Sequence, residues 1–292
     1  ASYAAAKSQI VDLCAPTGSI VFNADDSQID GMVNSTVAHR IAGRARVSFG
    51  IDAKADFTAQ IDDESVSGTR FRLQQRGRGG SAVDSMELTT GLVGRHNVLN
   101  CLAAAAVAVG QGVPDLAITS GIGALAWVPG RLESVNCGQP FEVFVDFAHT
   151  EEALRRCLGA LRRVVSGRVI CVFGAGGDRD RGKRPLLGKA AAAGSDICIV
   201  TSDNPRSEDP RRILDAIADG VAKGGVEPVV VEDRQDAIIE AIGMARAGDA
   251  ILVAGKGHET HQEIGGRRLR FDDREVVRAT LHGVAWSDRV GA

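Results

Sequence analysis

Charged and polar side chains gather in three short segments of the second half of the chain, each directly after an apolar run. These segments are GAGGDRDRGKR (174–184), DNPR (203–206) and GKGHE (255–259). Arginine presents a planar fork of N–H donors that suits carboxylates and phosphates. Glutamate can bind an ammonium group, and glycines let a ligand approach the backbone. These residue types indicate a binding site for a small charged molecule.

The first segment nearly fits a nucleotide-binding loop. Residues 177–184 lie between a strand-like run and a helix-like run and match GxxxxGK, but Arg184 occupies the position of the required Ser or Thr. Arginine has no oxygen to offer Mg²⁺. We therefore interpret the loop as a basic turn that could hold carboxylates or phosphates. A solvated basic loop and an unusual nucleotide hydrolase are the alternatives.

Other candidates carry weaker signals. Asn97 and Asn100 stand near the start of a predicted helix, where N–H groups and the helix dipole favour anions, although simple N-capping by Asn97 explains the pattern as well. Asp146 and His149 follow an apolar run, where an aspartate often accepts ribose hydroxyls but can equally be a structural cap. Lys7 alone reads as a solvated helix lysine.

The elements that must position these residues follow from periodicity. Apolar runs at 141–148, 168–175, 196–203, 227–233 and 250–257 alternate with helix-length segments. This pattern predicts a parallel sheet with helices on both faces, a doubly wound α/β domain. Such sheets bind ligands outside the carboxyl ends of their strands, which is where the polar segments fall.

The first half has a different pattern. Residues 44–90 alternate apolar and polar side chains, which predicts antiparallel strands, and an Ala-rich helix from near His96 precedes a second helix at 115–125. The turn-rich residues 136–140 are our candidate linker. We expect two domains, at 1–136 and 140–292.

Composition limits the classes of protein. The chain has 292 residues, of which 44% are hydrophobic and 24% charged, and a net charge of -3. These proportions exclude a largely disordered chain, and no overall field favours nucleic acid or an anionic membrane as partner. No apolar run approaches the roughly 20 residues that span a bilayer. We expect a cytoplasmic monomer.

Taken together, six motifs resemble the Mur ligases in order and spacing. They are GRHNVLN (94–100), PGRLE (129–133), VDFAHT (145–150), FGAGGDRDRGKRP (173–185), DNPR (203–206) and AGKGHE (254–259). The resemblance implies that 1–136 is the later part of the mixed-sheet central domain, which binds ATP, and that 140–292 is the Rossmann-like amino-acid-binding domain. The family's UDP-binding domain and GxxGKT loop are expected to lie outside this sequence, so we expect this chain alone to be inactive.

The resemblance also assigns roles to single residues. Lys7 matches the family lysine whose carbamate helps to position Mg²⁺, a hard cation that prefers oxygen ligands. Asn97, Asn100, Arg131 and Asp146 match nucleotide contacts, with His149 beside them, and Arg131 would also neutralise charge that develops in the reaction. The amino-acid contacts match Arg179, Asp203, Asn204, Pro205, Arg206, Gly255 and Glu259.

The implied activity is an ATP- and Mg²⁺-dependent amide ligation in peptidoglycan precursor synthesis. The segment DNPR is similar to that of ligases that add meso-diaminopimelate to UDP-N-acetylmuramoyl-L-alanyl-D-glutamate through an acyl phosphate, with Arg206 on the distal carboxylate. Phe147 and Glu151 depart from the usual Tyr and Pro. The alternatives are a non-catalytic module that keeps amino-acid recognition and another ligase of this fold, such as a folylpolyglutamate synthase.

Overall fold

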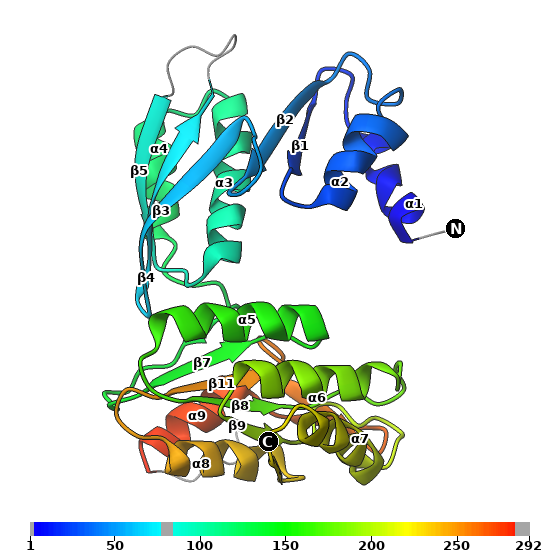
Figure 1. Cartoon of the computed structure of the whole chain (residues 1–292), viewed down its shortest axis with the longest axis vertical. Helices are drawn as coiled ribbons and strands as arrows, with labels where there is room; N and C mark the ends of the chain where they lie inside the picture. The colour runs from blue at the N-terminus through cyan, green and yellow to red at the C-terminus, as the bar shows by residue number, and fades with distance from the viewer. Residues whose placement is uncertain (1–2, 77–83, 284–292) are drawn as a thin grey trace. The chain divides into compact units, whose positions relative to one another are not determined.

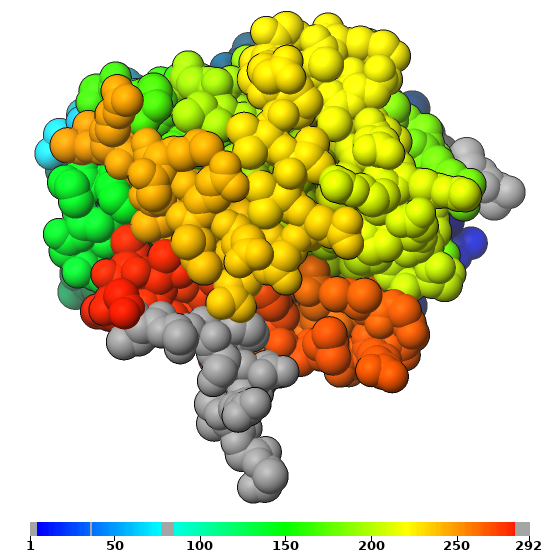
Figure 2. All heavy atoms as spheres, turned by 90° about the horizontal axis from the view of Figure 1, so that it is seen from below, coloured from blue at the N-terminus to red at the C-terminus, as the bar shows by residue number. Residues whose placement is uncertain are grey.

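The computed structural model describes residues 3–76 and 84–283. It divides into two compact units, Ala1–Ala126 and Trp127–Ala292. Figure 1 labels most helices and strands of both units, and Figure 2 draws all heavy atoms as spheres, seen from below. No helix in the described ranges is long and apolar enough to cross a membrane.

The first unit contains a mixed five-stranded sheet in the order β1-β2-β3-β4-β5. Its strands are β1 (Ser19–Asn23), β2 (Ala45–Gly50), β3 (Phe57–Ser65), β4 (Gly68–Gln75) and β5 (Asp84–Thr90). Its helical segments are α1 (Tyr3–Ser8), η1 (Gln9–Leu13), α2 (Ser27–Gly31), η2 (Met32–Thr36), α3 (Arg95–Gly110) and α4 (Asp115–Ala124). One face of α3, including Val98 and Leu102, packs on Phe71 and Leu88 of the sheet.

The prediction of antiparallel strands over 44–90 is correct for β3, β4 and β5 but wrong for β2. This strand runs parallel to both of its neighbours, β1 and β3. The connection from β1 to β2 contains α2 and η2, as a crossover between parallel strands requires. Alternating burial shows which face of a strand is covered, but it is the same for either direction of pairing.

The second unit is built on a six-stranded sheet in the order β10-β9-β8-β11-β7-β6. Its strands are β6 (Glu133–Ser134), β7 (Glu142–Asp146), β8 (Val169–Phe173), β9 (Ile197–Val200), β10 (Pro228–Val230) and β11 (Ala250–Ala254). All neighbours are parallel except β6, which is antiparallel to β7. The predicted fold class, a mixed sheet followed by a doubly wound α/β unit, is confirmed.

Helices cover both faces of this sheet (Figure 1). They are α5 (Glu151–Val164), α6 (Lys183–Gly194), α7 (Pro210–Lys223), α8 (Arg234–Met244) and α9 (Asp273–Leu281). Val145, Val172 and Val253 of adjacent strands pack against Ile238 of α8 and Val276 of α9. A hairpin of β12 (His261–Ile264) and β13 (Arg267–Arg270) follows β11. Residues 136–140, where the sequence predicts a linker, form the turn between β6 and β7 inside this unit.

A fully buried ion pair joins the starts of α8 and α9. Arg234 Nε and Nη2 lie 2.7 and 2.8 Å from the two carboxylate oxygens of Asp273, and both side chains have no exposed surface. Arg234 Nη2 also donates to the carbonyl of Ala254, the last residue of β11, over 3.0 Å. The pair therefore ties two helices to the end of a central strand.

We expect Asp273→Asn to lower the free energy of unfolding by about 3–5 kcal/mol, because it leaves the Arg234 cation buried without its counterion. The matched control is Asp219→Asn, which breaks the exposed pair that Asp219 forms with Lys223 and should cost at most about 1 kcal/mol. Denaturant titration of both variants measures the difference. Equal losses would contradict the structural role of the buried pair.

Candidate functional site

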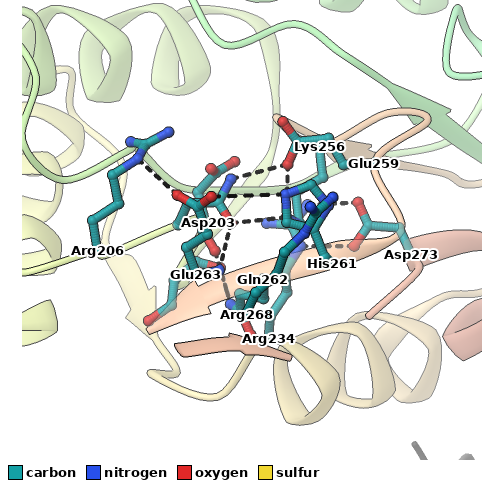
Figure 3. A network of polar contacts seen from close by, with 12 residues as sticks. Asp203, Arg206, Arg234, Lys256, Glu259, His261, Gln262, Glu263, Arg268 and Asp273 are labelled. Carbon is teal, nitrogen blue, oxygen red and sulfur yellow. Dashed lines mark hydrogen bonds and ion pairs between the residues drawn. The ribbon is translucent and has the colours of Figure 1, made fainter. Parts of the chain in front are cut away.

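Three loops leave the carboxyl ends of neighbouring parallel strands. The loops follow Phe173 of β8, Val200 of β9 and Ala254 of β11, and these strands lie in the order β9-β8-β11. Because parallel strands end at the same edge of a sheet, residues from three distant segments can meet there. Figure 3 shows the polar network in which residues that follow β9 and β11 take part.

A triangle of hydrogen bonds lies at the centre of this network. Lys256 Nζ donates to Asn204 Oδ1 over 3.1 Å and to Glu259 Oε2 over 2.9 Å. Asn204 Nδ2 donates to the same Glu259 oxygen over 2.9 Å. Burial raises the pKa of Glu259, but the hydrogen bonds from Lys256 and Asn204 outweigh it and leave the pKa below its ordinary value. The carboxylate is therefore kept charged.

Arg206 is anchored at both its backbone and its side chain. Its backbone N–H donates to the carbonyl of Glu263 in β12, and its own carbonyl accepts from the N–H of Gly265. The guanidinium donates from Nε to Glu263 Oε2 over 3.0 Å and from Nη1 to the carbonyl of Gly177 over 2.8 Å. These contacts hold Arg206 at a φ of 55°, a conformation that costs a non-glycine residue about 1–3 kcal/mol.

Arg179 lies close to Arg206 across Gly176. A Cβ atom at Gly176 would stand 2.8 Å from Arg206 Nη1 and 3.8 Å from Arg179 Cγ. Arg179 is exposed, and its Nη1 donates to the carbonyl of Asp178 over 3.1 Å. Two guanidinium groups and the carboxylate of Glu259 thus belong to one edge of the sheet. Such an arrangement can bind a molecule that carries both acid and ammonium groups.

Asp203 and Gly255 fit against each other. A Cβ atom at Gly255 would stand 2.5 Å from Asp203 Oδ2, and Gly255 has a φ of +117°. Asp203 is buried, and within the described part of the chain no group donates to its Oδ2. Burial raises the pKa of Asp203, although Arg234 and Lys256 oppose the rise. The absence of a side chain at Gly255 therefore leaves room for the Asp203 carboxylate.

Glu208 fastens the loop after β8 to the loop after β9. It accepts hydrogen bonds from Arg184 Nη1 and Nη2 over 3.2 and 2.7 Å and from the N–H of Asp178 over 2.6 Å. The hydrogen bonds from Arg184 and from the Asp178 backbone lower the pKa of Glu208 to about 2. Arg184 is buried in this contact, so the basic loop offers its exposed arginines, rather than Arg184, to a ligand.

The predicted nucleotide contacts of this unit lie at the end of β7. Asp146 is buried and accepts from the N–H groups of Leu132 and Ala148 over 2.6 and 2.7 Å, which fixes the loop that carries Arg131. Arg131 and His149 are exposed beside Phe147: the Arg131 Cζ lies 5.6 Å and the His149 ring centre 4.7 Å from the centre of the Phe147 ring. The Asp146 carboxylate is thus engaged by neighbouring backbone N–H groups. The exposed side chains of Arg131 and His149 can be reached by a ligand.

The remaining predicted residues belong to the first unit. Asn97 lies inside α3 rather than at its cap, and its Nδ2 donates to the carbonyl of Val93 over 2.9 Å. Asn100 Nδ2 donates to Asn97 Oδ1 over 3.1 Å. Lys7 is exposed in α1. Among the described residues, no group of three His, Cys, Asp or Glu side chains could hold a metal ion.

Comparison with known proteins identifies the family of both units. Residues 1–108 match the Mur ligase middle domain, and residues 130–257 match the Mur ligase glutamate ligase domain. The chain belongs to the Mur ligase family. Both of its units thus correspond to domains of one family, which explains why two differently built sheets follow each other.

The relatives described next all carry the name of one enzyme. It is 44% identical over 241 residues to the UDP-N-acetylmuramoyl-L-alanyl-D-glutamate--2,6-diaminopimelate ligase of Solibacter usitatus, covering 82% of this chain and 48% of that protein. The enzyme of the same name from Caldanaerobacter subterraneus is 39% identical over 279 residues, covering 96% and 55%. A solved structure of such a ligase aligns with a TM-score of 0.61 at 35% identity, covering 96% and 56%. The chain spans about half the length of the curated relatives it matches.

Sequence reasoning missed several residues of this network. Lys256 and Glu263 contact partners that lie 52 and 57 positions away along the chain. Gln262 of β12 likewise donates to the carbonyl of Asp203 over 2.8 Å. Lys256 stands inside the GKGHE segment, so its position in a site loop could have marked it as a candidate. Nothing in the sequence indicates that β12 packs against the loop after β9.

The pKa of Glu208 predicts how stability depends on pH. Because the pKa falls from 4.5 to about 2 on folding, the stabilisation is complete above pH 4.5 and disappears as the pH falls through about 2. We expect the advantage of the unsubstituted chain over Glu208→Gln in unfolding free energy to shrink over this range. The control is Glu227→Gln at an exposed position. An advantage that stays constant across the range would contradict the assignment.

Gly255→Ala should destabilise the chain more than the matched control Gly266→Ala. Gly266 also has a positive φ, of 75°, but a Cβ atom there meets nothing within 4 Å, so only the backbone cost of about 1–2 kcal/mol applies. At Gly255 the Cβ would also collide with the Asp203 carboxylate, which adds about 1–3 kcal/mol. Chemical denaturation of both variants tests the difference, and equal costs would show that the carboxylate moves aside freely.

Proposed function

We propose that this chain is the amino-acid-binding portion, with part of the ATP-binding portion, of a ligase that adds meso-diaminopimelate to UDP-N-acetylmuramoyl-L-alanyl-D-glutamate. The observation that carries the proposal is the placement of Arg179, Arg206 and Glu259 at one strand edge, with Arg206 held by Glu263 and Gly177. The reaction belongs to peptidoglycan precursor synthesis in the cytoplasm, and the protein acts as a monomer.

The chemistry of the ligand matches these side chains. Each end of meso-diaminopimelate carries a carboxylate and an ammonium group. Arg206 has its Nε and Nη1 already engaged by Glu263 and Gly177, which fixes the plane of the guanidinium before a ligand carboxylate arrives. Glu259 offers a charged carboxylate to an ammonium group. Preorganised partners of both signs lower the entropy cost of binding.

ATP, bound with Mg²⁺, would supply the phosphoryl group that activates the acceptor carboxylate. Arg131 and His149 beside Phe147, together with Asn97 and Asn100, are the residues of this chain that we assign to the nucleotide. Lys7 is assigned to Mg²⁺ through a carbamate. Because no group of three His, Cys, Asp or Glu side chains among the described residues could hold a metal ion, the part proposed for this chain in holding Mg²⁺ is limited to Lys7.

Arg206→Lys tests the proposal by calorimetry with meso-diaminopimelate and with lysine, which lacks the distal carboxylate. We expect affinity for meso-diaminopimelate to fall about 10-fold or more, since the side chain of a lysine at position 206 cannot form the paired hydrogen bonds of a guanidinium fork. Affinity for free lysine should change little. The control is Arg212→Lys in α7, where the side chain is 83% exposed.

Two results would count against this function. One is the absence of measurable meso-diaminopimelate binding by the unsubstituted chain. The other is an Arg206→Lys variant that binds meso-diaminopimelate as tightly as the Arg212→Lys control.

A further inference from the structure

Lys256 is a fully buried cation within the site loop that follows β11. Its side chain has no exposed surface, and its Nζ contacts Asn204 and Glu259 (Figure 3). We propose that Lys256 is a positioning residue that orients Asn204 and Glu259 and so gives the site its selectivity for a ligand ammonium group. This inference rests on the proposed function and names the residue that controls one half of ligand recognition.

Lys256 helps to set which way the Asn204 amide points. Asn204 Oδ1 accepts from two donors, Lys256 Nζ at 3.1 Å and the backbone N–H of Glu263 at 2.9 Å. A flipped amide would place its own N–H group against both of these donors. The observed orientation is therefore forced, and it turns Nδ2 toward Glu259.

Lys256 also makes the two carboxylate oxygens of Glu259 different, because it binds Oε2 and not Oε1. Lys256 and Asn204 both donate to Oε2, each over 2.9 Å. Among the described residues, none donates to Oε1, and the Glu259 side chain is 26% exposed. One oxygen thus holds the carboxylate in place, and the other is left for a ligand. An ammonium group is the ligand donor that gains most from such a charged acceptor.

The buried charge of Lys256 requires both Glu259 and Asn204 as partners. A buried ammonium group is stable only with a counterion and full hydrogen bonding. Glu259 supplies the counterion, and Asn204 supplies a further acceptor. Removal of the Lys256 charge would leave Glu259 with Asn204 as its remaining side-chain donor, and the carboxylate would lose its fixed direction.

The test compares three ligands by competition calorimetry on the full chain. Pimelate keeps both carboxylates of meso-diaminopimelate and lacks its ammonium groups, whereas lysine lacks one carboxylate. The unsubstituted chain should prefer meso-diaminopimelate over pimelate by about 10-fold or more, as expected for hydrogen bonds to a charged group. Lys256→Met should reduce this preference to about 2-fold while keeping the preference over lysine, which depends on Arg206.

The matched control is Lys223→Met, which removes an exposed lysine of α7 that pairs with Asp219 and should leave both preferences unchanged. Glu259→Gln should reproduce the loss caused by Lys256→Met, and the double variant should lose nothing further, because both act on one interaction. Equal weakening of all three ligands by Lys256→Met would overturn the proposal, since a purely structural role does not distinguish between them. Additive effects in the double variant would overturn it as well.

If Lys256→Met does not fold, Asn204→Asp provides an independent test. Aspartate keeps an oxygen for Lys256 and the Glu263 N–H but places a second anion where Nδ2 faces Glu259. The preference over pimelate should then fall and the preference over lysine should remain, whereas an unchanged preference over pimelate would overturn the inference. Failure of the unsubstituted chain to bind meso-diaminopimelate contradicts the proposed function itself. Binding with a preference that neither substitution changes contradicts this inference alone.

Discussion

The site depends on two buried cations near the end of β11. Arg234 and Lys256 are both fully buried, and Asp273 and Glu259 are their respective partners. A desolvated cation that loses its counterion strongly destabilises the fold. The segments that carry these carboxylates are therefore held in position. Asn204 is bonded to the same pair, so the loop after β9 is fixed by the same constraint. The positions of Asn204 and Glu259 therefore follow from the need to pair the buried charges of Arg234 and Lys256.

Backbone strain is concentrated in the loops that carry this geometry. In the described ranges, the non-glycine residues with positive φ are Leu132, Asp178 and Arg206. Each is held by a specific partner: the Leu132 N–H by Asp146, Asp178 by Ser207 and Glu208, and Arg206 by Glu263. Such conformations persist only where the surroundings determine them. The strain is therefore consistent with loops selected for where they place side chains rather than for local stability.

The sequence was sufficient to predict the sheet edge and most of the groups on it. Apolar runs followed at once by polar segments place Asn204, Arg206 and Glu259 at strand ends, and the parallel order of those strands brings them together. It could not predict that Lys256 turns inward, that Glu263 reaches Arg206 from a hairpin, or that β2 runs parallel to its neighbours. Those features depend on tertiary contacts between segments far apart in the chain, which neither local periodicity nor local propensity records.

Charge balance connects the buried layer with the choice of ligand. Arg206, Arg234 and Lys256 each pair with one carboxylate, that of Glu263, Asp273 and Glu259 respectively. A ligand with as many carboxylates as ammonium groups leaves this balance unchanged, whereas lysine adds a positive charge and a plain dicarboxylate adds negative charge. In a partly desolvated site an uncompensated charge is costly. A neutral cluster of this kind would therefore add to the selectivity proposed for Arg206 and Glu259, because the proposed doubly zwitterionic ligand leaves no charge uncompensated.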